Sequence, residues 1–136
     1  MGIRENKAAL LDSIEAFNDP KDRQRYFTAL YTPDAVIHSI PGYTPDLDGF
    51  RKYYGRLWAA FPDMRLNLED VVAEGDVLAP RFTGTGTNTG PLGDMAPTGK
   101  RVTFAGMTVL YFRGGKCFER WGIFDQMGLM RQLRGG

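Results

Sequence analysis

One carboxylate near the end of the chain, Asp125, has the residue type and the surroundings of an acid/base group. It ends the segment "KCFERWGIFD", which has the alternation of a β-strand. Barring a bulge, that alternation places on the face of Asp125 the side chains of Cys117, Glu119, Trp121 and Ile123. Apolar surroundings disfavour the anion of a carboxyl group. A carboxylate of this kind can accept a proton from an acidified carbon and later return it to an alkoxide.

The same aspartate has a second interpretation, as a helix cap. It stands directly before "QMGLMRQL", which has the pattern of a short helix, and aspartate is a preferred N-cap residue. A capping carboxylate accepts hydrogen bonds from backbone amides, and these bonds stabilise the anion. The two roles therefore compete, and the residues alone favour the cap.

Two further polar residues are candidates for contacts with a substrate. His38, in "VIHSI", is the only histidine, so a three-histidine metal site is excluded. A lone histidine in such a segment is more often a half-buried residue with its own hydrogen bonds than a catalyst. Asn88 could donate to an enolate or carbonyl oxygen, or could serve only to hold its own loop.

The chain also holds enough large apolar side chains to line a pocket for a flat ligand. The candidates are Trp58, Phe61, Phe104, Met107 and Trp121. Two of them belong to a stripe at helical spacing, formed by Phe50, Tyr53, Tyr54, Leu57, Trp58 and Phe61. The usual explanation of such a stripe is a packed core, and it can also border a ligand if the core is hollow.

The elements that position these residues start with helices. Apolar spacing predicts a helix over 3–17, and "NDP" predicts a second one with Asp19 as N-cap and Pro20 in its first turn. This second helix ends before "TPD", and a short extended stretch over 35–40 follows. The aromatic stripe predicts a third helix over 50–61.

From Met64 onward the pattern changes to strands. Residues 64–87 predict two strands joined by a turn at 74–76, and 100–112 with 116–125 predict two more, joined by "RGGK". A short helix closes the chain. This order predicts an α+β meander, not alternating βαβ units, in one domain over 1–136.

The stretch "GTGTNTG" at 84–90 resembles a phosphate-binding loop in its glycines alone. A dinucleotide loop must open a helix, whose N-terminus binds the phosphates. The following "PLGDMAPTGK" carries two prolines and two glycines that prevent a helix. The glycines therefore indicate a strand that bends strongly or lets another group approach closely.

Composition and charge exclude several classes. Seventeen Lys and Arg against 16 Asp and Glu give a formal net charge of +1, so nothing favours nucleic acid or an anionic membrane as a partner. One cysteine, Cys117, excludes an internal disulfide and a thiolate metal cluster. The N-terminus lacks a secretion signal and no run spans a membrane, so a cytoplasmic protein is expected.

Three segments carry a resemblance to a known family. They are "RFTGTGTNTG", "APTGKRVTF" and "GKCFERWGIFD", preceded by "YTPDAVIHSIPGY" and "GFRKYYGRLWAAFPDMRLNLED". The chain after residue 26 resembles the SnoaL-like polyketide cyclases (ester cyclases) of the nuclear transport factor 2-like superfamily. The resemblance implies an α+β cone: a curved antiparallel sheet wrapped around N-terminal helices, enclosing an apolar pocket.

The resemblance also implies an activity. Characterised cyclases of the family close a ring by intramolecular aldol condensation on an aromatic polyketide methyl ester, without a metal or organic cofactor. It assigns the acid/base role to Asp125 and makes His38 a candidate donor to a substrate oxygen. It further implies a homodimer or homotetramer formed through the outer sheet face. Members commonly have histidine at the positions of Asn88 and Arg120, and this chain lacks both imidazoles.

Three functions follow as hypotheses. The first is a cofactor-independent cyclase or isomerase that acts on a hydrophobic, aromatic or polycyclic carbonyl compound, with Asp125 as base and the enolate held by Asn88 or His38. The second is an epoxide hydrolase or hydratase, which needs a second acid, for which Glu119 is the one candidate. The third is a non-catalytic module for apolar-ligand binding or dimerisation, which the missing imidazoles favour.

Overall fold

Three helices and one short strand come first in the chain, and four long strands then follow one another, as the predicted meander requires. The structure, a computed structural model, describes residues 2–135. In chain order the elements are α1 (Ile3–Phe17), α2 (Arg25–Leu30), β1 (Tyr31–Ile37), α3 (Leu47–Ala60), β2 (Arg65–Glu74), β3 (Val77–Thr87), β4 (Arg101–Arg113), β5 (Lys116–Phe124) and α4 (Gln126–Gly135). The predicted α+β class is confirmed. Across residues 2–135 no helix has the length and apolar character to cross a membrane.

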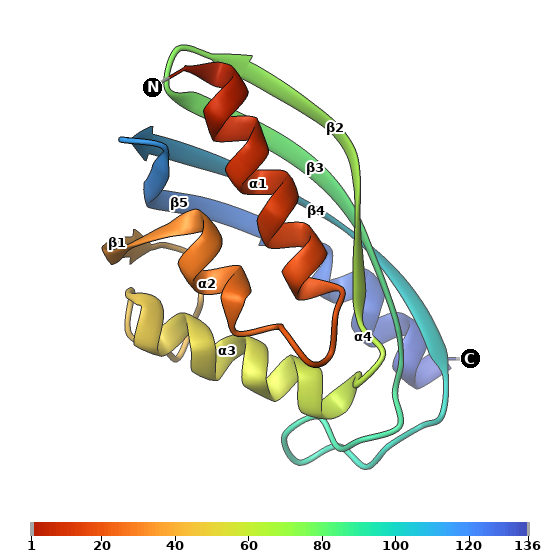
Figure 1. Cartoon of the computed structure of the whole chain (residues 1–136). Coiled ribbons are helices and arrows are strands. Elements are labelled where there is room, and N and C mark those ends of the chain that lie inside the picture. Colours follow the sequence, from red (N-terminus) through yellow and green to blue (C-terminus); the bar gives the residue numbers. More distant parts are fainter. Residues whose placement is uncertain (1, 136) are drawn as a thin grey trace.

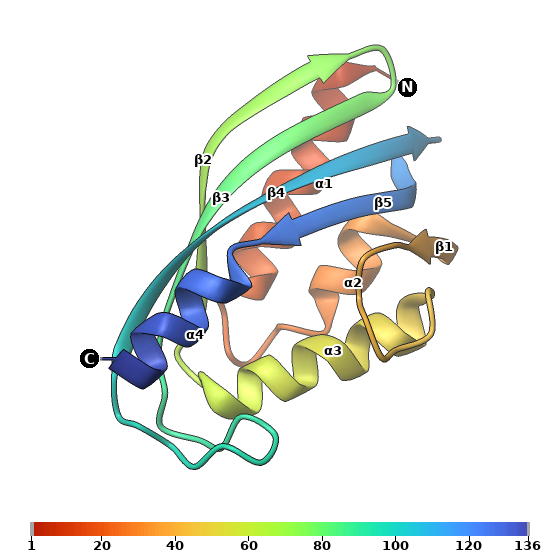
Figure 2. The ribbon, with the colours of Figure 1, turned by 180° about the vertical axis from the view of Figure 1, so that it is seen from behind.

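The sheet has five strands in the order β1-β5-β4-β3-β2. It curves around α1, α2 and α3, which lie on its inner face (Figure 1). Seen from behind, its outer face carries no helix over β2 to β5, and α4 lies beside the lower part of β4 (Figure 2). All neighbouring pairs are antiparallel except β1 with β5, which is parallel. The sheet is therefore mostly antiparallel, as predicted, with one parallel pair at its edge.

The ends of the long helices are set by local hydrogen bonds. Before α1, the Gly2 amide donates to the Glu5 carboxylate over 2.8 Å. The Asp46 carboxylate accepts from the Gly49 amide over 2.9 Å and caps α3, so this helix begins before the predicted residue 50. Both helices bury their apolar stripes, and the aromatic rings of α3 form the centre of the core.

The second helix is shorter than predicted. The Asp19 carboxylate accepts from the Lys21 amide over 3.0 Å, and the chain then runs through turns until α2 begins at Arg25. The predicted helix start at Asp19 and Pro20 is therefore wrong, because short-range hydrogen bonds close a turn there instead. The strand after it runs over Tyr31–Ile37, earlier than predicted, because β5 provides its pairing partner. β1 is an edge strand, and this position tolerates Pro33.

The glycines of "GTGTNTG" make room for aromatic rings. A Cβ added at Gly84 would lie 2.3 Å from the Phe104 ring, and one at Gly86 would lie 3.0 Å from Cβ of Phe61. Both glycines lie in β3, and residues 88–100 form a loop without a helix. The predicted close approach is confirmed, and its partners are side chains of the core.

Candidate functional site

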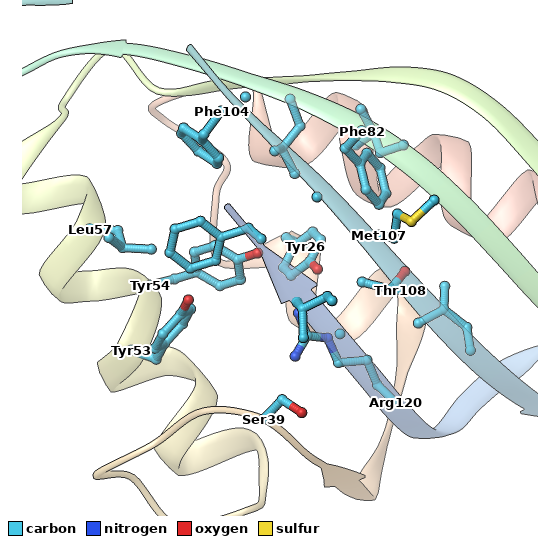
Figure 3. Close-up of a pocket in the computed structure, with 18 of the residues that line it drawn as sticks. Tyr26, Ser39, Tyr53, Tyr54, Leu57, Phe82, Phe104, Met107, Thr108 and Arg120 are labelled. Carbon is cyan, nitrogen blue, oxygen red and sulfur yellow. The ribbon is translucent and has the colours of Figure 1, made fainter. Parts of the chain in front are cut away.

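A cavity of about 340 Å³ lies between the inner face of the sheet and the helices. This volume is at the lower end of the range of about 300–1,000 Å³ for small-molecule sites. Figure 3 shows its wall, with Tyr53, Tyr54 and Leu57 from α3, and Phe82, Phe104 and Thr108 from the sheet. Most of the lining is apolar or phenolic. Among the described lining residues there is no carboxylate and no imidazole, and Arg120 is the one charged residue.

A β-bulge decides which residues of β5 face this cavity. Tyr111 of β4 pairs with Glu119, but the next residue, Phe112, pairs with Cys117, so Phe118 is an extra residue in β5. An extra residue reverses the alternation of everything that follows it. Arg120 therefore points inward with Gly122. Trp121 and Ile123, which were predicted to share the face of Asp125, are exposed like Asp125 itself.

The guanidinium of Arg120 is buried in the cavity wall, and the residue is only 8% exposed. Its Nη1 donates to the main-chain oxygen of His38 over 3.0 Å, and its Cζ lies 4.9 Å from the centre of the Phe50 ring. Burial opposes the charge, but attraction to the neighbouring tyrosines in their ionised form, which they take only in strongly alkaline solution, raises the pKa of Arg120 above its ordinary value. The group therefore stays a cation at every pH at which the protein is folded.

Four tyrosines surround this cation and supply neutral hydroxyl groups. Burial raises the pKa of all four above the ordinary tyrosine value, and they are Tyr26, Tyr31, Tyr53 and Tyr54. Because these groups are protonated at neutral pH, they can donate hydrogen bonds to a ligand but do not neutralise the arginine. The hydroxyls of Tyr26 and Tyr31 lie 3.4 Å apart. The site combines an apolar volume, phenolic donors and one positive charge.

The structure places Asp125 outside the cavity lining. Its side chain is exposed, and Oδ1 accepts from the Gly128 amide over 2.9 Å, so the carboxylate caps α4. The expected position on an apolar inner face is corrected, because the bulge reverses the strand and α4 begins at the next residue. Its chain neighbours Phe124 and Gln126 both line the cavity, so Asp125 stands at the rim.

His38 and Trp121 lie together on the outer face of the sheet. The two rings stack with centroids 3.7 Å apart, and Nε2 of His38 lies 2.8 Å from the Glu119 carboxylate. Trp121 is 48% exposed. Neither side chain lines the cavity, so their predicted contacts with a substrate stay a prediction that this geometry does not favour. The bulge turned Glu119 and Trp121 outward, and the parallel pairing of β1 with β5 placed His38 beside them.

Asn88 is buried, and its amide is fully used by the loop. Nδ2 donates to the main-chain oxygens of Ala60 and Gly90, at 3.2 and 2.9 Å, and Oδ1 accepts from the amide and hydroxyl of Thr98, each at 2.9 Å. These bonds fasten the 88–100 loop to the end of α3. Asn88 is not among the lining residues, and it has the loop-holding contacts of the second of its two predicted roles.

The four remaining predicted binding residues divide into two pairs. Phe104 lines the cavity, and Met107 contributes to the lining although it is 56% exposed. Trp58 and Phe61 are core residues behind the wall. Trp58 stacks on the lining residue Tyr54 at 5.4 Å, and Phe61 packs against Gly86. These two hold the wall in place without forming its surface.

Sequence reasoning missed the group with the largest charge in the cavity. In the sequence Arg120 stood out only because family members commonly have histidine at this position. Regular alternation along the strand over 116–125 would have pointed its side chain to solvent. A signal was present: "ERW" offers an arginine inside an apolar strand, and buried arginines are rare unless they have a partner. Tyr53 and Tyr54 were found as stripe residues, but their hydroxyls were not expected to face a ligand.

A curved sheet that wraps helices and leaves an apolar cavity defines the class of the protein as nuclear transport factor 2-like. The family follows from comparison with known sequences, since the model of the SnoaL-like polyketide cyclase family matches residues 8–133. The chain belongs to the SnoaL-like polyketide cyclase family. Comparison with curated protein sequences found no match.

Solved structures support the same assignment. AclR from Streptomyces galilaeus, a proposed hydroxylase, is 30% identical with a TM-score of 0.83, over 96% of this chain and 82% of that one. IdmH from Streptomyces antibioticus, a proposed polyketide cyclase, is 28% identical with a TM-score of 0.81, over 94% and 97%. TsrD from Streptomyces laurentii, at 24% identity and a TM-score of 0.84 over 100% and 99%, is similar in fold.

Proposed function

We propose that the protein is a cyclase-type enzyme that closes a ring in a flat, largely apolar carbonyl compound of polyketide type. The observation that carries this proposal is the cavity itself, whose apolar wall includes Arg120 and the tyrosine hydroxyls as the donors to substrate oxygens. Its size at the lower end of ligand sites favours a substrate of two or three fused rings when closed. Family membership and the proposed activity of IdmH support the same reaction class.

The reaction requires a base, a hydrogen-bond donor and a folded substrate. In the proposed sequence Asp125 accepts a proton from the carbon next to a carbonyl, and the resulting enolate attacks a second carbonyl of the same molecule. A carbon–carbon bond forms, and the new alkoxide takes the proton back from Asp125. The guanidinium and the phenols stabilise the oxygen that carries the charge, as positioned donors do in acyl and aldol chemistry.

Asp125 keeps this role as a proposal because of its place at the rim. It stands between two lining residues, Phe124 and Gln126, so a substrate that protrudes from the cavity mouth would meet it. Oδ1 accepts from the Gly128 amide, so the proposal gives the proton transfer to Oδ2, for which the described structure shows no hydrogen bond. His38, on the outer face, is left with a supporting role through its main-chain bond to Arg120.

The test compares turnover of open-chain aromatic polyketide analogues by the wild-type protein and by Asp125→Asn, followed by absorbance and mass spectrometry. Asparagine can still accept the Gly128 bond, so the variant should fold with an unchanged melting temperature while turnover falls about 100-fold or more. Retained turnover would show that another group moves the proton. No turnover by the wild-type protein on any analogue would overturn the enzymatic proposal.

A non-catalytic ligand-binding protein is the second candidate, and one observation favours it. The described cavity lining contains no carboxylate or imidazole, so a ligand inside it would meet no ordinary base. Binding of aromatic ketones without any turnover would support this candidate. A second copy of the chain is the expected partner in either case, and the exposed apolar side chains of β4 and β5, among them Met107, Trp121 and Ile123, support a homodimer or homotetramer.

A further inference from the structure

Arg120 has more hydrogen-bonding capacity than the protein uses. A guanidinium carries five N–H donors, and in the described structure the one hydrogen bond it makes runs from Nη1 to the His38 oxygen. Its Nε is buried and has no hydrogen-bond partner among the described residues. In Figure 3 the group extends from β5 into the cavity, toward the space bordered by Ser39, Tyr26 and Tyr53. Nη2, which makes no hydrogen bond in the described structure and is not among the buried unpaired atoms, is therefore the donor group that a ligand can reach.

A second unpartnered polar group lies in the same wall. Oγ1 of Thr108 is buried and has no hydrogen-bond partner among residues 2–135. Thr108 pairs with Gly122 across β4 and β5, and a Cβ at Gly122 would lie 2.5 Å from Nη2 of Arg120 and 2.8 Å from Cγ2 of Thr108. The absence of a side chain at Gly122 thus makes room for the Arg120 guanidinium, which packs over this glycine beside the methyl group of Thr108.

Within the described residues, no carboxylate contacts this buried charge. Glu119, the neighbouring acid in the chain, points to the outer face and contacts His38 at 2.8 Å. The four tyrosines are neutral at physiological pH, since burial raises the pKa of each. Keeping an ionised group out of water without a counter-charge is strongly unfavourable. The arrangement is complete only when an anion enters the cavity.

We infer that the cavity binds a ligand that carries a carboxylate, held by the free N–H groups of Arg120 and the hydroxyl of Thr108. Arginine matches the two oxygens of a carboxylate with parallel hydrogen bonds, and such charge-assisted bonds are about twice as strong as neutral ones. The inference rests on the proposed function, in which a flat apolar molecule fills the rest of the cavity. It changes the expected substrate from a methyl ester to the free acid.

A purely structural role for Arg120 makes a different prediction. The Phe50 ring and the tyrosines could hold the cation by cation–π and polar contacts alone. In that case the charge would not distinguish an acid from a neutral ligand of the same shape. Ligand selectivity therefore separates the two roles.

The experiment measures binding of 2-naphthoate, 2-naphthamide and methyl 2-naphthoate by calorimetry at pH 7.5. The amide has nearly the shape of the acid without its charge. The wild-type protein should bind the acid at least about tenfold more tightly than either neutral compound. Arg120→Met should lose this preference, Arg120→Lys should keep part of it, and Thr108→Val should reduce it. Arg81→Met, which removes an exposed arginine paired with Asp70, should change nothing.

Each outcome decides between the two claims. Equal affinity of the wild-type protein for acid and amide, or a preference that survives in Arg120→Met, overturns the inference and leaves the proposed function standing. Failure of all three naphthalenes to bind overturns both, because the proposed function requires a cavity that takes flat rings. The wild-type comparison needs no variant, so a folding defect of Arg120→Met would not hide the result.

Discussion

The main-chain oxygen of His38 accepts a hydrogen bond from the Arg120 guanidinium over 3.0 Å, and the His38 amide donates to the Arg120 oxygen over 2.8 Å. These two bonds join the end of β1 to β5. The side chains leave the junction on opposite faces, with the imidazole beside Glu119 outside and the guanidinium in the cavity. The histidine thus positions the charged residue through its backbone.

Replacing Arg120 with methionine should stabilise the ligand-free protein. The variant removes a buried charge without a counter-ion and keeps an apolar side chain of similar length. We expect the free energy of unfolding to rise by about 1–2 kcal/mol after the lost bond to His38 is included. Urea denaturation measures it, with Arg81→Met as a surface control that should stay within about 0.5 kcal/mol. A large loss of stability would show that the aromatic groups compensate the charge.

Asp125→Ala should weaken the start of α4. The alanine cannot accept the Gly128 hydrogen bond, so the free energy of unfolding should fall by about 1 kcal/mol. Asp125→Asn should stay close to the wild-type value, because its amide oxygen can cap. Hydrogen exchange of the α4 amides locates the effect. Equal stability of the alanine variant would contradict the capping role.

Gly84→Ala should destabilise the protein by about 1–3 kcal/mol, because its Cβ would lie 2.3 Å from the Phe104 ring. The matched control is Gly55→Ala, at an exposed position inside α3 with nothing within 4 Å of the new Cβ. That control should gain about 0.5–1 kcal/mol from helix propensity. Gly84→Ala combined with Phe104→Leu should recover part of the loss. Thermal unfolding of the four proteins tests this packing, and a neutral Gly84→Ala would refute it.

Stability should fall in alkaline solution, and Cys117 should contribute to the fall. Burial raises the pKa of its thiol to about 12. In the unfolded chain the thiol ionises near its ordinary value of about 8.5–9, so the thiol's contribution is present below that pH and is lost between it and about 12. The expected slope from this group is about 1.4 kcal/mol per pH unit. Urea midpoints from pH 8 to 10.5 measure it.

The control for this pH dependence is Cys117→Ala, which removes the titrating thiol. Its absolute stability will be lower because it leaves a small cavity, so the comparison concerns the slope alone. The variant should show a flatter profile between pH 8.5 and 9.5, where the tyrosines of the unfolded chain, with an ordinary pKa near 10, are still mostly protonated. Identical slopes would mean that the thiol does not contribute.

Ile123→Lys should shift the expected homo-oligomer toward the monomer. Ile123 is 73% exposed and pairs in register with Met107, which is 56% exposed, so a charge there would be buried by a second copy of the sheet. Val72→Lys, at a 69% exposed apolar position of β2, is the control outside this pair. Sedimentation over a range of concentrations measures the distribution. A monomeric wild-type protein would contradict the expected assembly.

Several features of the fold followed from local pattern. The helical spacing around Phe50 to Phe61, the two long hairpins and the turn at Gly114 and Gly115 are set by residues close in sequence, and the structure contains each of them. The resemblance of the strand segments to a family was sufficient for the α+β cone. In contrast, the start of α2 was predicted at the wrong place. The residues after Asp19 can begin a helix or form turns, and the sequence pattern does not distinguish the two.

The site depended on information that is not local. The pattern of "KCFERWGIFD" contains no mark of the extra residue at Phe118, and which face receives Arg120 or Asp125 depends on how β5 pairs with β4. The sequence by itself determined the elements, their order and the apolar character of the interior. Only the tertiary structure decided which polar groups enter the cavity. The pairing of a strand with its neighbour fixes which side chains face inward, and one extra residue in the strand moves the inward-facing side chains to the other face.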